Sequence, residues 1–137
     1  FVIQKMPMRF CRMRHLQHLP IWRDATRLLL AIEQAVRLFP RYHKYTLGTE
    51  LRQQAMRVCR LIMRAADQRA DQAQWLHQLV TAVDDLKLAV QLAKELEAFK
   101  SFKEFQAIAE LAVAVGKQSG GWRKRLLGAN GQHRPGT

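Results

Sequence analysis

Apolar residues in this chain recur every three or four positions in four separate segments, the spacing that places side chains on one face of an α-helix. The alternating pattern of a β-strand is absent. Ser101 and Glu104 form the Ser-x-x-Glu pattern that opens a helix. The spacing predicts helices over residues 20–39, 46–66, 71–98 and 101–120. Four such helices with short connections predict an all-α fold, an antiparallel up-down-up-down four-helix bundle.

The 137 residues suffice for one domain with a hydrophobic core, which we place at residues 20–125. Residues 1–19 mix apolar and basic side chains without a period, so we expect a flexible basic arm. Residues 126–137 are polar and rich in glycine, so we expect a disordered tail.

The chain carries 23 lysines and arginines against 11 acidic residues, a net charge of +12. The charge is uneven, because residues 20–66 hold nine basic and three acidic side chains, whereas residues 67–100 hold four basic and six acidic ones. A polarised excess of this size indicates a polyanionic partner, RNA or DNA.

The predicted helix at 46–66 separates its charges from its apolar residues. On a wheel of about 100° per residue, Arg57, Arg60 and Arg64 fall together nearly opposite the apolar arc, and Arg52 falls toward the edge. Glu50 is the only acid in this helix. Two interpretations stay open: a stripe that binds phosphates, or a solvated face without a partner.

The predicted helix at 71–98 is apolar on two sides. Its main face runs from Trp75 to Ala93, and a second face lies more than about 100° away. A helix that is apolar on two sides needs two neighbours. The second face is therefore either a subunit interface or the sign of a helix more deeply buried at its end. Its residues are Leu88, Leu92, Leu96 and Phe99.

Aromatic and basic residues are interleaved in the connection before the helix at 46–66. Tyr42 and Tyr45 flank Lys44, and Arg41 precedes them, a composition that suits stacking on unpaired bases. The alternative is that the tyrosines pack this turn against the end of the bundle. Another basic cluster, Arg123, Lys124 and Arg125, lies near the end of the last helix.

The sequence lacks the residue patterns of catalysis. It contains no Ser-His-Asp set, glycine-rich phosphate loop or paired inward carboxylates, so we expect no enzyme activity and no cofactor. Cys11, His15 and His18 have a spacing that suits a metal, but no fourth ligand accompanies them, so we expect no metal site. Cys59 lies at the margin of an apolar arc, where a thiol usually fills space.

The chain shows no sign of membrane insertion or export. No apolar run reaches the roughly 18 to 20 residues that span a bilayer, and the first residues lack the apolar stretch of a secretory signal. The two cysteines lie in different settings and do not suggest a disulfide framework. We therefore expect a cytoplasmic protein.

Three stretches form a recognisable set: Phe39-Pro40 followed by Lys44-Tyr45-Thr46-Leu47-Gly48, the passage from Ala93 to Phe105, and the run from Gly116 to Trp122. Together they resemble the accessory variability determinant (Avd) proteins of diversity-generating retroelements. The match covers about residues 20–125. The stretches also resemble four-helix-bundle proteins encoded in ribosomal RNA intervening sequences. Those relatives usually end their second helix with an Asn-Ile-Ala-Glu-Gly-like stretch, which this chain lacks at Met63–Asp67, and this favours the retroelement branch.

The resemblance implies a ring-shaped homopentamer with a positively charged surface. It implies a non-enzymatic partner of the reverse transcriptase and its template RNA or cDNA in mutagenic retrohoming. Many relatives carry an acid where this chain has Ala114, so no role of that acid transfers. The alternatives are an RNA-binding bundle of the intervening-sequence type and a structural oligomer that binds no nucleic acid. The residues expected to bind nucleic acid or polymerase are Arg41, Lys44, Arg52, Arg57, Arg60, Arg64, Arg123, Lys124 and Arg125.

Overall fold

The computed structural model describes residues 13–131, and within this range the chain forms helices and no strand. The 3-10 helix η2 (Met13–His18) precedes α2 (Pro20–Arg37), α3 (Arg41–Lys44) and α4 (Leu47–Asp67). The 3-10 helix η3 (Arg69–Asp71) then leads into α5 (Gln72–Glu95) and α6 (Phe102–Gly131). The predicted all-α fold class is confirmed.

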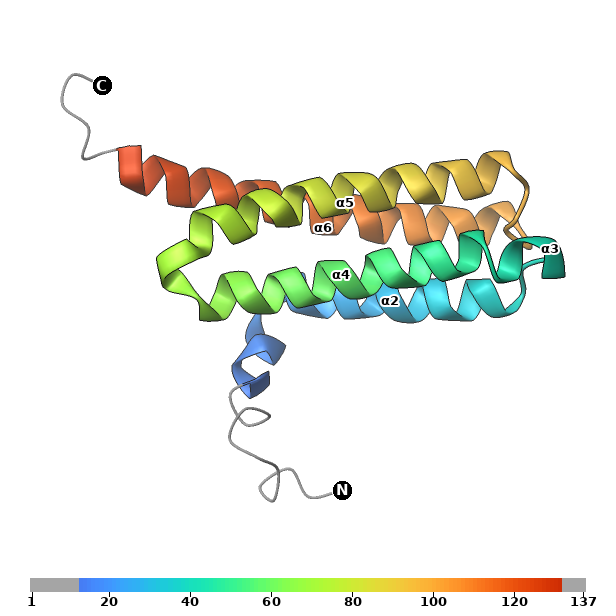
Figure 1. Cartoon of the computed structure of the whole chain (residues 1–137), viewed down its shortest axis with the longest axis horizontal. Coiled ribbons are helices and arrows are strands. Elements are labelled where there is room, and N and C mark those ends of the chain that lie inside the picture. Colours follow the sequence, from blue (N-terminus) through green and yellow to red (C-terminus); the bar gives the residue numbers. More distant parts are fainter. Residues whose placement is uncertain (1–12, 132–137) are drawn as a thin grey trace, which may run out of the picture.

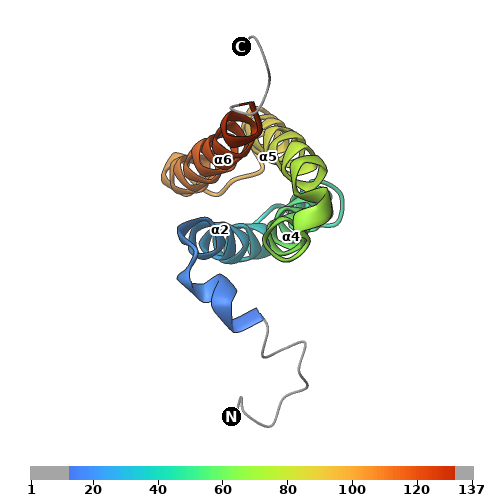
Figure 2. The same cartoon turned by 90° about the vertical axis from the view of Figure 1, so that its left-hand side faces the viewer.

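The four long helices form an antiparallel bundle (Figure 1). Viewed from one end, α2 and α4 form one layer and α5 and α6 the other (Figure 2). α4 packs between α2 and α5, and α6 packs between α5 and α2. As a result, α4 and α6 occupy diagonally opposite corners, and each long helix has two neighbours.

The predicted apolar faces make up the core. Burial of each large aliphatic side chain stabilises the fold by about 1.5–3 kcal/mol. In α4, Leu61 and Ala65 are buried together with Leu51 and Ile62, because α4 has neighbours on two sides. Core side chains that are at most 1% exposed include Leu28, Ile32, Leu51, Ile62, Leu79, Leu86 and Ile108.

Gly48 lies at the start of α4, directly against Val36 of α2. A Cβ atom at this position would lie 2.6 Å from Cγ1 of Val36, a distance that carbon atoms do not tolerate. Only glycine lets α4 begin this close to α2. The Thr-Leu-Gly part of the motif therefore has a packing reason.

The structure corrects the predicted flexible arm for residues 13–18. These residues form η2, which contacts α2 and α4, and Leu16 is completely buried there. The amide of Leu19 donates a hydrogen bond to the carbonyl of Leu16 at 2.9 Å. Burial of Leu16 therefore anchors a segment whose sequence has no helical periodicity. The remainder of the predicted arm, residues 1–12, lies outside the described residues.

The last helix is longer than predicted. α6 continues through Gly120 and Gly121 and ends at Gly131, where the sequence predicted a helix end at 120 and a disordered tail from 126. A glycine costs a helix only about 1 kcal/mol relative to alanine. Trp122 and Leu126 pack against the core beyond the two glycines and hold the helix in place.

The connection before α4 contains the short helix α3, where the sequence predicted no element. The amides of His43 and Lys44 donate to the carbonyl of Pro40 at 2.9 and 3.0 Å. The side chain of Thr46 does not cap α4, because its hydroxyl donates back to the carbonyls of Tyr42 and His43. The threonine therefore stabilises α3 rather than the start of α4.

The connection between α5 and α6 is a tight turn closed by the backbone. α5 ends at Glu95, three residues before the predicted end, because Glu97 adopts a left-handed φ of 58°. The amides of Glu97 and Ala98 donate to the carbonyls of Lys94 and Ala93, the pattern of a Schellman turn. At the start of α6, the amide of Glu104 donates to Oγ of Ser101 at 3.2 Å, as the capping pattern predicted.

The start of α5 has no side-chain cap. Asp71 is the N-cap residue, but its side chain makes no capping hydrogen bond. Nε2 of Gln72 instead donates to the carbonyl of Ala65 at 2.7 Å. This contact joins the first turn of α5 to the end of α4.

Candidate nucleic-acid interface

The three arginines of the predicted stripe lie on the outer face of α4. Arg57, Arg60 and Arg64 are all exposed, whereas Leu51 and Ile62 on the inner face are fully buried. None of the three guanidinium groups forms an ion pair within residues 13–131. Their charges face solvent, where phosphate groups can reach them.

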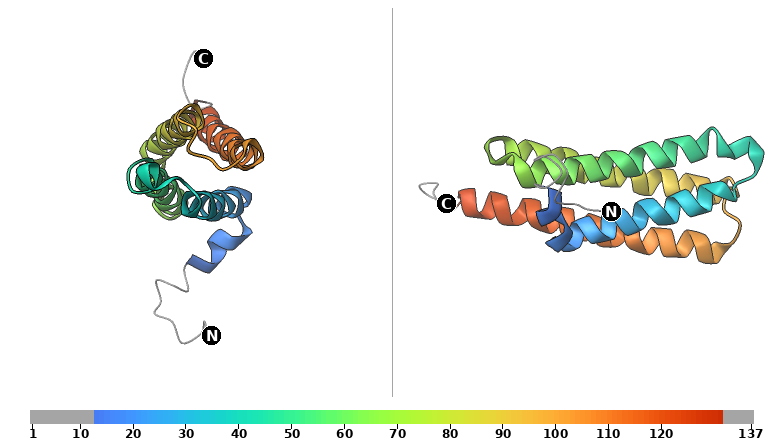
Figure 3. Two further views of the ribbon diagram at one scale, coloured as in Figure 1. Left: turned by 90° about the vertical axis from the view of Figure 1, so that its right-hand side faces the viewer. Right: turned by 90° about the horizontal axis from the view of Figure 1, so that it is seen from below.

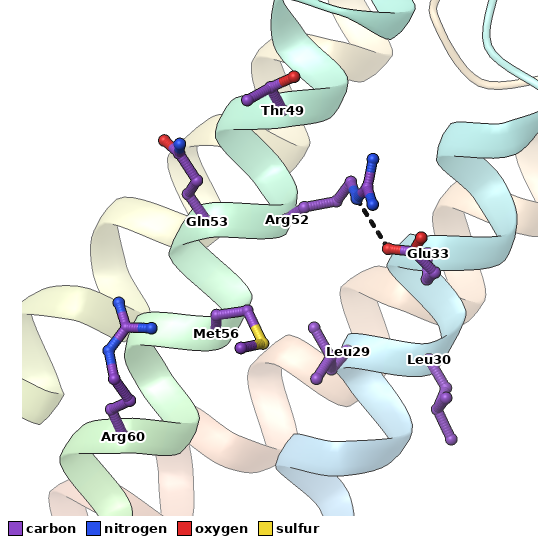
Figure 4. A pocket seen from close by; sticks show the side chains of 8 residues that line it. All are labelled: Leu29, Leu30, Glu33, Thr49, Arg52, Gln53, Met56 and Arg60. Atoms are coloured by element: carbon purple, nitrogen blue, oxygen red, sulfur yellow. Dashed lines mark ion pairs between the residues drawn. The ribbon is translucent and has the colours of Figure 1, made fainter.

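Arg52 differs from these three because it is paired inside the chain. Its Nε lies 2.8 Å from Oε2 of Glu33 on α2 (Figure 4). Both side chains are partly exposed, so the pair contributes at most about 1 kcal/mol to stability. It nevertheless offsets the charge of Arg52 and links α4 to α2. Arg52 is therefore less available to a phosphate than the rest of the stripe.

Arg64 is held in place by an aromatic ring. Its Cζ lies 5.2 Å from the centroid of the Trp75 ring, and Nε1 of Trp75 donates to Oε1 of Gln68 at 2.9 Å. Stacking occupies the flat face of a guanidinium and leaves its N–H edge free to donate. Trp75 thus positions Arg64 without consuming its hydrogen-bond donors.

An open depression of about 580 Å³ lies between α2 and α4, beside the stripe. Leu29, Leu30 and Met56 line it, and Figure 4 shows Met56 and Leu29 directed toward each other. The predicted helix faces did not indicate this apolar lining. The sequence did contain a hint of it, because Leu30 and Met56 are apolar residues that lie outside the faces of their helices that pack in the core. In the structure their side chains are 62% and 46% exposed.

A second depression, of about 440 Å³, lies on the other side of the stripe, between α4 and α5. Arg57 and Arg60 line it together with the carboxylates of Glu50 and Asp85. These acids offset part of the arginine charge on that side. The ridge of α4 itself is the part of this face best suited to a polyanion.

The other predicted basic residues do not join the stripe. Arg41 and Lys44 lie on α3 at one end of the bundle, whereas Arg123–Arg125 lie on α6 toward the other end (Figure 1). α6 is also diagonally opposite α4. The nine residues proposed from the sequence therefore occupy three separate places on the surface.

Tyr42 and Tyr45 are 84% and 72% exposed. They do not pack the turn against the bundle end, which was one of the two interpretations of the sequence. Among the described aromatic rings, that of Tyr42 meets the ring of its neighbour His43 edge-on, with centroids 5.1 Å apart. Both tyrosines are displayed to solvent.

Three of the four residues on the second apolar face of α5 form an exposed stripe. Leu88, Leu92 and Leu96 are 59%, 47% and 53% exposed. Phe99 lies beyond the end of α5 and is half-buried, with its ring edge-to-face on Phe39 at 5.3 Å. The three leucines are uncovered in the single chain, and Phe99 joins the two connections at that end of the bundle.

The buried cysteine Cys59 is not a reactive group. Burial raises the pKa of its thiol from 9.0 to about 11, although nearby Arg60 lowers it. The thiol is therefore protonated at neutral pH, and its sulfur faces the carbonyl of Ala25 at 3.9 Å. A protonated thiol in the core fills space, as the sequence pattern predicted.

Of the three residues whose spacing suits a metal, the structure describes His15 and His18. Cys11 lies outside the described residues, and Nε2 of His15 lies 3.2 Å from Oδ1 of Asp67. Within residues 13–131, no three His, Cys, Asp or Glu side chains gather as a metal site would require. In the same range, no helix combines the length and the apolar character needed to cross a bilayer.

The comparison with known families agrees with the fold and with the resemblance seen in the sequence. No curated protein matches the chain in sequence. The bAvd-like family matches residues 21–126, a range that includes α3, α4 and α5, nearly all of α2 and most of α6. This range covers well over half of the chain and contains both the arginine stripe and the exposed leucines. The chain therefore belongs to the bAvd-like family and is an accessory protein of the Avd type.

Proposed function

We propose that the chain is a non-enzymatic, cytoplasmic accessory protein of a diversity-generating retroelement, and that it binds the reverse transcriptase and nucleic acid. Its partners are the template RNA or cDNA and the polymerase, and its role is to support mutagenic retrohoming. Family membership and the net charge of +12 support this proposal.

The observation that carries the nucleic-acid part is the unpaired arginine stripe on α4. Within residues 13–131, Arg57, Arg60 and Arg64 stand on one exposed face without a carboxylate partner, although Glu50 and Asp85 are near. A row of guanidinium groups that form no ion pair within the described residues binds phosphates by releasing their condensed counterions, independently of base sequence. This mode suits a protein that follows a template of varying sequence.

The proposal includes a homopentamer whose subunits meet at the leucine stripe of α5. Leu88, Leu92 and Leu96 expose apolar surface that a single chain leaves in contact with water. A contiguous apolar strip of this kind is typical of a protein contact. Phe99 borders the strip and fixes the adjoining turn.

The test is charge reversal of the stripe. In the R57E/R60E/R64E variant, we expect RNA affinity to fall and the salt dependence of binding to weaken. The log–log slope should decrease by about 0.7 to 0.9 for each phosphate that the variant no longer neutralises. Fluorescence anisotropy across a salt titration measures both quantities. A pull-down with the reverse transcriptase measures the polymerase contact.

A matched control separates the site from the overall charge. The R23E/R27E/K117E variant makes the same change in net charge on exposed positions of α2 and α6. It should retain most of the affinity. Equal weakening in both variants would show that only net charge matters, and full binding by the α4 variant would remove the stripe from the proposal.

A further inference from the structure

The exposed aromatic side chains gather at one end of the bundle. Within the described residues, Tyr42, Tyr45 and Phe102 are 84%, 72% and 63% exposed, whereas the other aromatic rings are buried or half-buried. The tyrosines belong to α3 and the residue after it, and Phe102 is the first residue of α6. These two connections lie at the same end (Figure 1 and Figure 3, left).

The tyrosines stand on a backbone that their neighbours hold firmly. Thr46 donates its hydroxyl to the carbonyls of Tyr42 and His43 at 3.3 and 3.4 Å, and the α3 amides bond to Pro40. Gly48 lets α4 start tightly against α2. Each of these neighbours has a structural role inside the chain. The two tyrosine rings are exposed, although Tyr42 meets the ring of its neighbour His43. Their exposure on an ordered turn suits an external ligand.

The connection that carries the two tyrosines is positively charged. No acid occurs in residues 34–49, which contain Arg37, Arg41 and Lys44. In the other connection, Nζ of Lys94 lies 5.7 Å from the centroid of the Phe102 ring. Residues 94–104 hold three lysines and three acids, so the excess positive charge of this end lies on the α3 side. A partner with flat rings and negative charge fits that side.

We propose that this end of the bundle binds unpaired bases of single-stranded RNA. Tyr42 and Tyr45 stack on the bases, and Arg41 and Lys44 contact the adjacent phosphates. In a duplex the bases stack on one another and hide their faces, so the tyrosines can reach only unpaired ones. The inference rests on the proposed nucleic-acid function and deepens it, because α4 holds phosphates of any strand while α3 distinguishes unpaired from paired RNA.

The test compares two RNA probes on the full chain. The probes are a short fluorescein-labelled RNA of mixed sequence without secondary structure, and the duplex that it forms with its complement. The Y42A/Y45A variant should bind the single strand about fivefold or more weakly for each base that no longer stacks. Its affinity for the duplex and the slope of its salt dependence should stay as in the unaltered protein, because no cation is removed.

Two control variants decide how a weakened affinity is interpreted. The Y42F/Y45F variant retains the aromatic faces and should bind both probes normally, whereas R57E/R60E/R64E should weaken both and reduce the salt slope. Unchanged single-strand binding by Y42A/Y45A, or equal weakening on both probes, would overturn the inference while leaving the α4 stripe intact. A reduced subunit number for Y42A/Y45A in light scattering would identify this end as a protein contact and would also overturn it. If the unaltered protein binds neither probe, the proposed nucleic-acid function fails as well.

Discussion

The neighbouring helices α4 and α5 each turn one face to the core and carry a second face of distinct chemistry. On α4 that second face is Arg57, Arg60 and Arg64, and on α5 it is Leu88, Leu92 and Leu96. Charged side chains are well hydrated, so the α4 face is satisfied in a single chain. Exposed leucines are in unfavourable contact with water, and covering them with another apolar surface lowers the free energy. The α4 face is thus suited to a reversible polyanionic ligand, and the α5 face to a lasting protein contact.

The largest expected effect comes from placing charge on the α5 face. The L88D/L92D variant should lose self-association completely, because carboxylates would have to be desolvated in the contact. Light scattering measures the subunit number. L30D/M56D is the matched control, with the same change on exposed apolar residues beside α4. If the unaltered protein is a monomer, or if L88D/L92D assembles normally, the two faces do not differ as described.

Side-chain truncation to alanine should change the free energy of unfolding very differently on the two sides of α5. Leu86 is fully buried, so L86A should lower the free energy of unfolding by about 2–5 kcal/mol. Leu88 is 59% exposed, so L88A should cost within about 0.5 kcal/mol at low protein concentration. Urea unfolding at two protein concentrations checks this. A cost for L88A that grows with concentration would locate Leu88 in the subunit contact, since assembly stabilises by mass action.

The smallest expected effect concerns the α4 face. R64A removes the contact with Trp75 and should lower the free energy of unfolding by about 0.5–1 kcal/mol. Arg60 stacks on no ring in the described part of the chain, so R60A should leave stability nearly unchanged. Paired urea titrations of the two variants measure the difference. Equal stability of R64A and R60A would mean that Trp75 does not hold Arg64 in solution.

Much of the candidate site could be predicted from the helical period. The wheel placed Arg57, Arg60 and Arg64 on one face because a regular helix fixes the direction of each side chain from its position in the sequence. It could not show that Glu33 pairs with Arg52, because these residues come from different helices. It also could not show that Arg41 and Lys44 lie on a separate short helix and that Arg123–Arg125 lie on the helix diagonally opposite α4, which depends on how the helices are arranged.

The differences from the predicted elements have local physical causes. The sequence predicted that Gly120 and Gly121 end a helix, but Trp122 packs against the core and offsets their cost. It predicted an arm where Leu16 is buried. In both places a single tertiary contact outweighs the local preference, since burial of one large apolar side chain is worth about 1.5–3 kcal/mol.

By itself, the sequence determined the fold class, the core faces of the long helices, the polarised charge and the likeness to the Avd proteins. These follow from periodicity and composition, which act over one or a few helical turns. Only the tertiary structure decided that Tyr42 and Tyr45 are exposed beside the connection that carries Phe102, and that Leu88, Leu92 and Leu96 are uncovered by the chain. Exposure depends on which distant segments pack over a residue, and no local pattern encodes that.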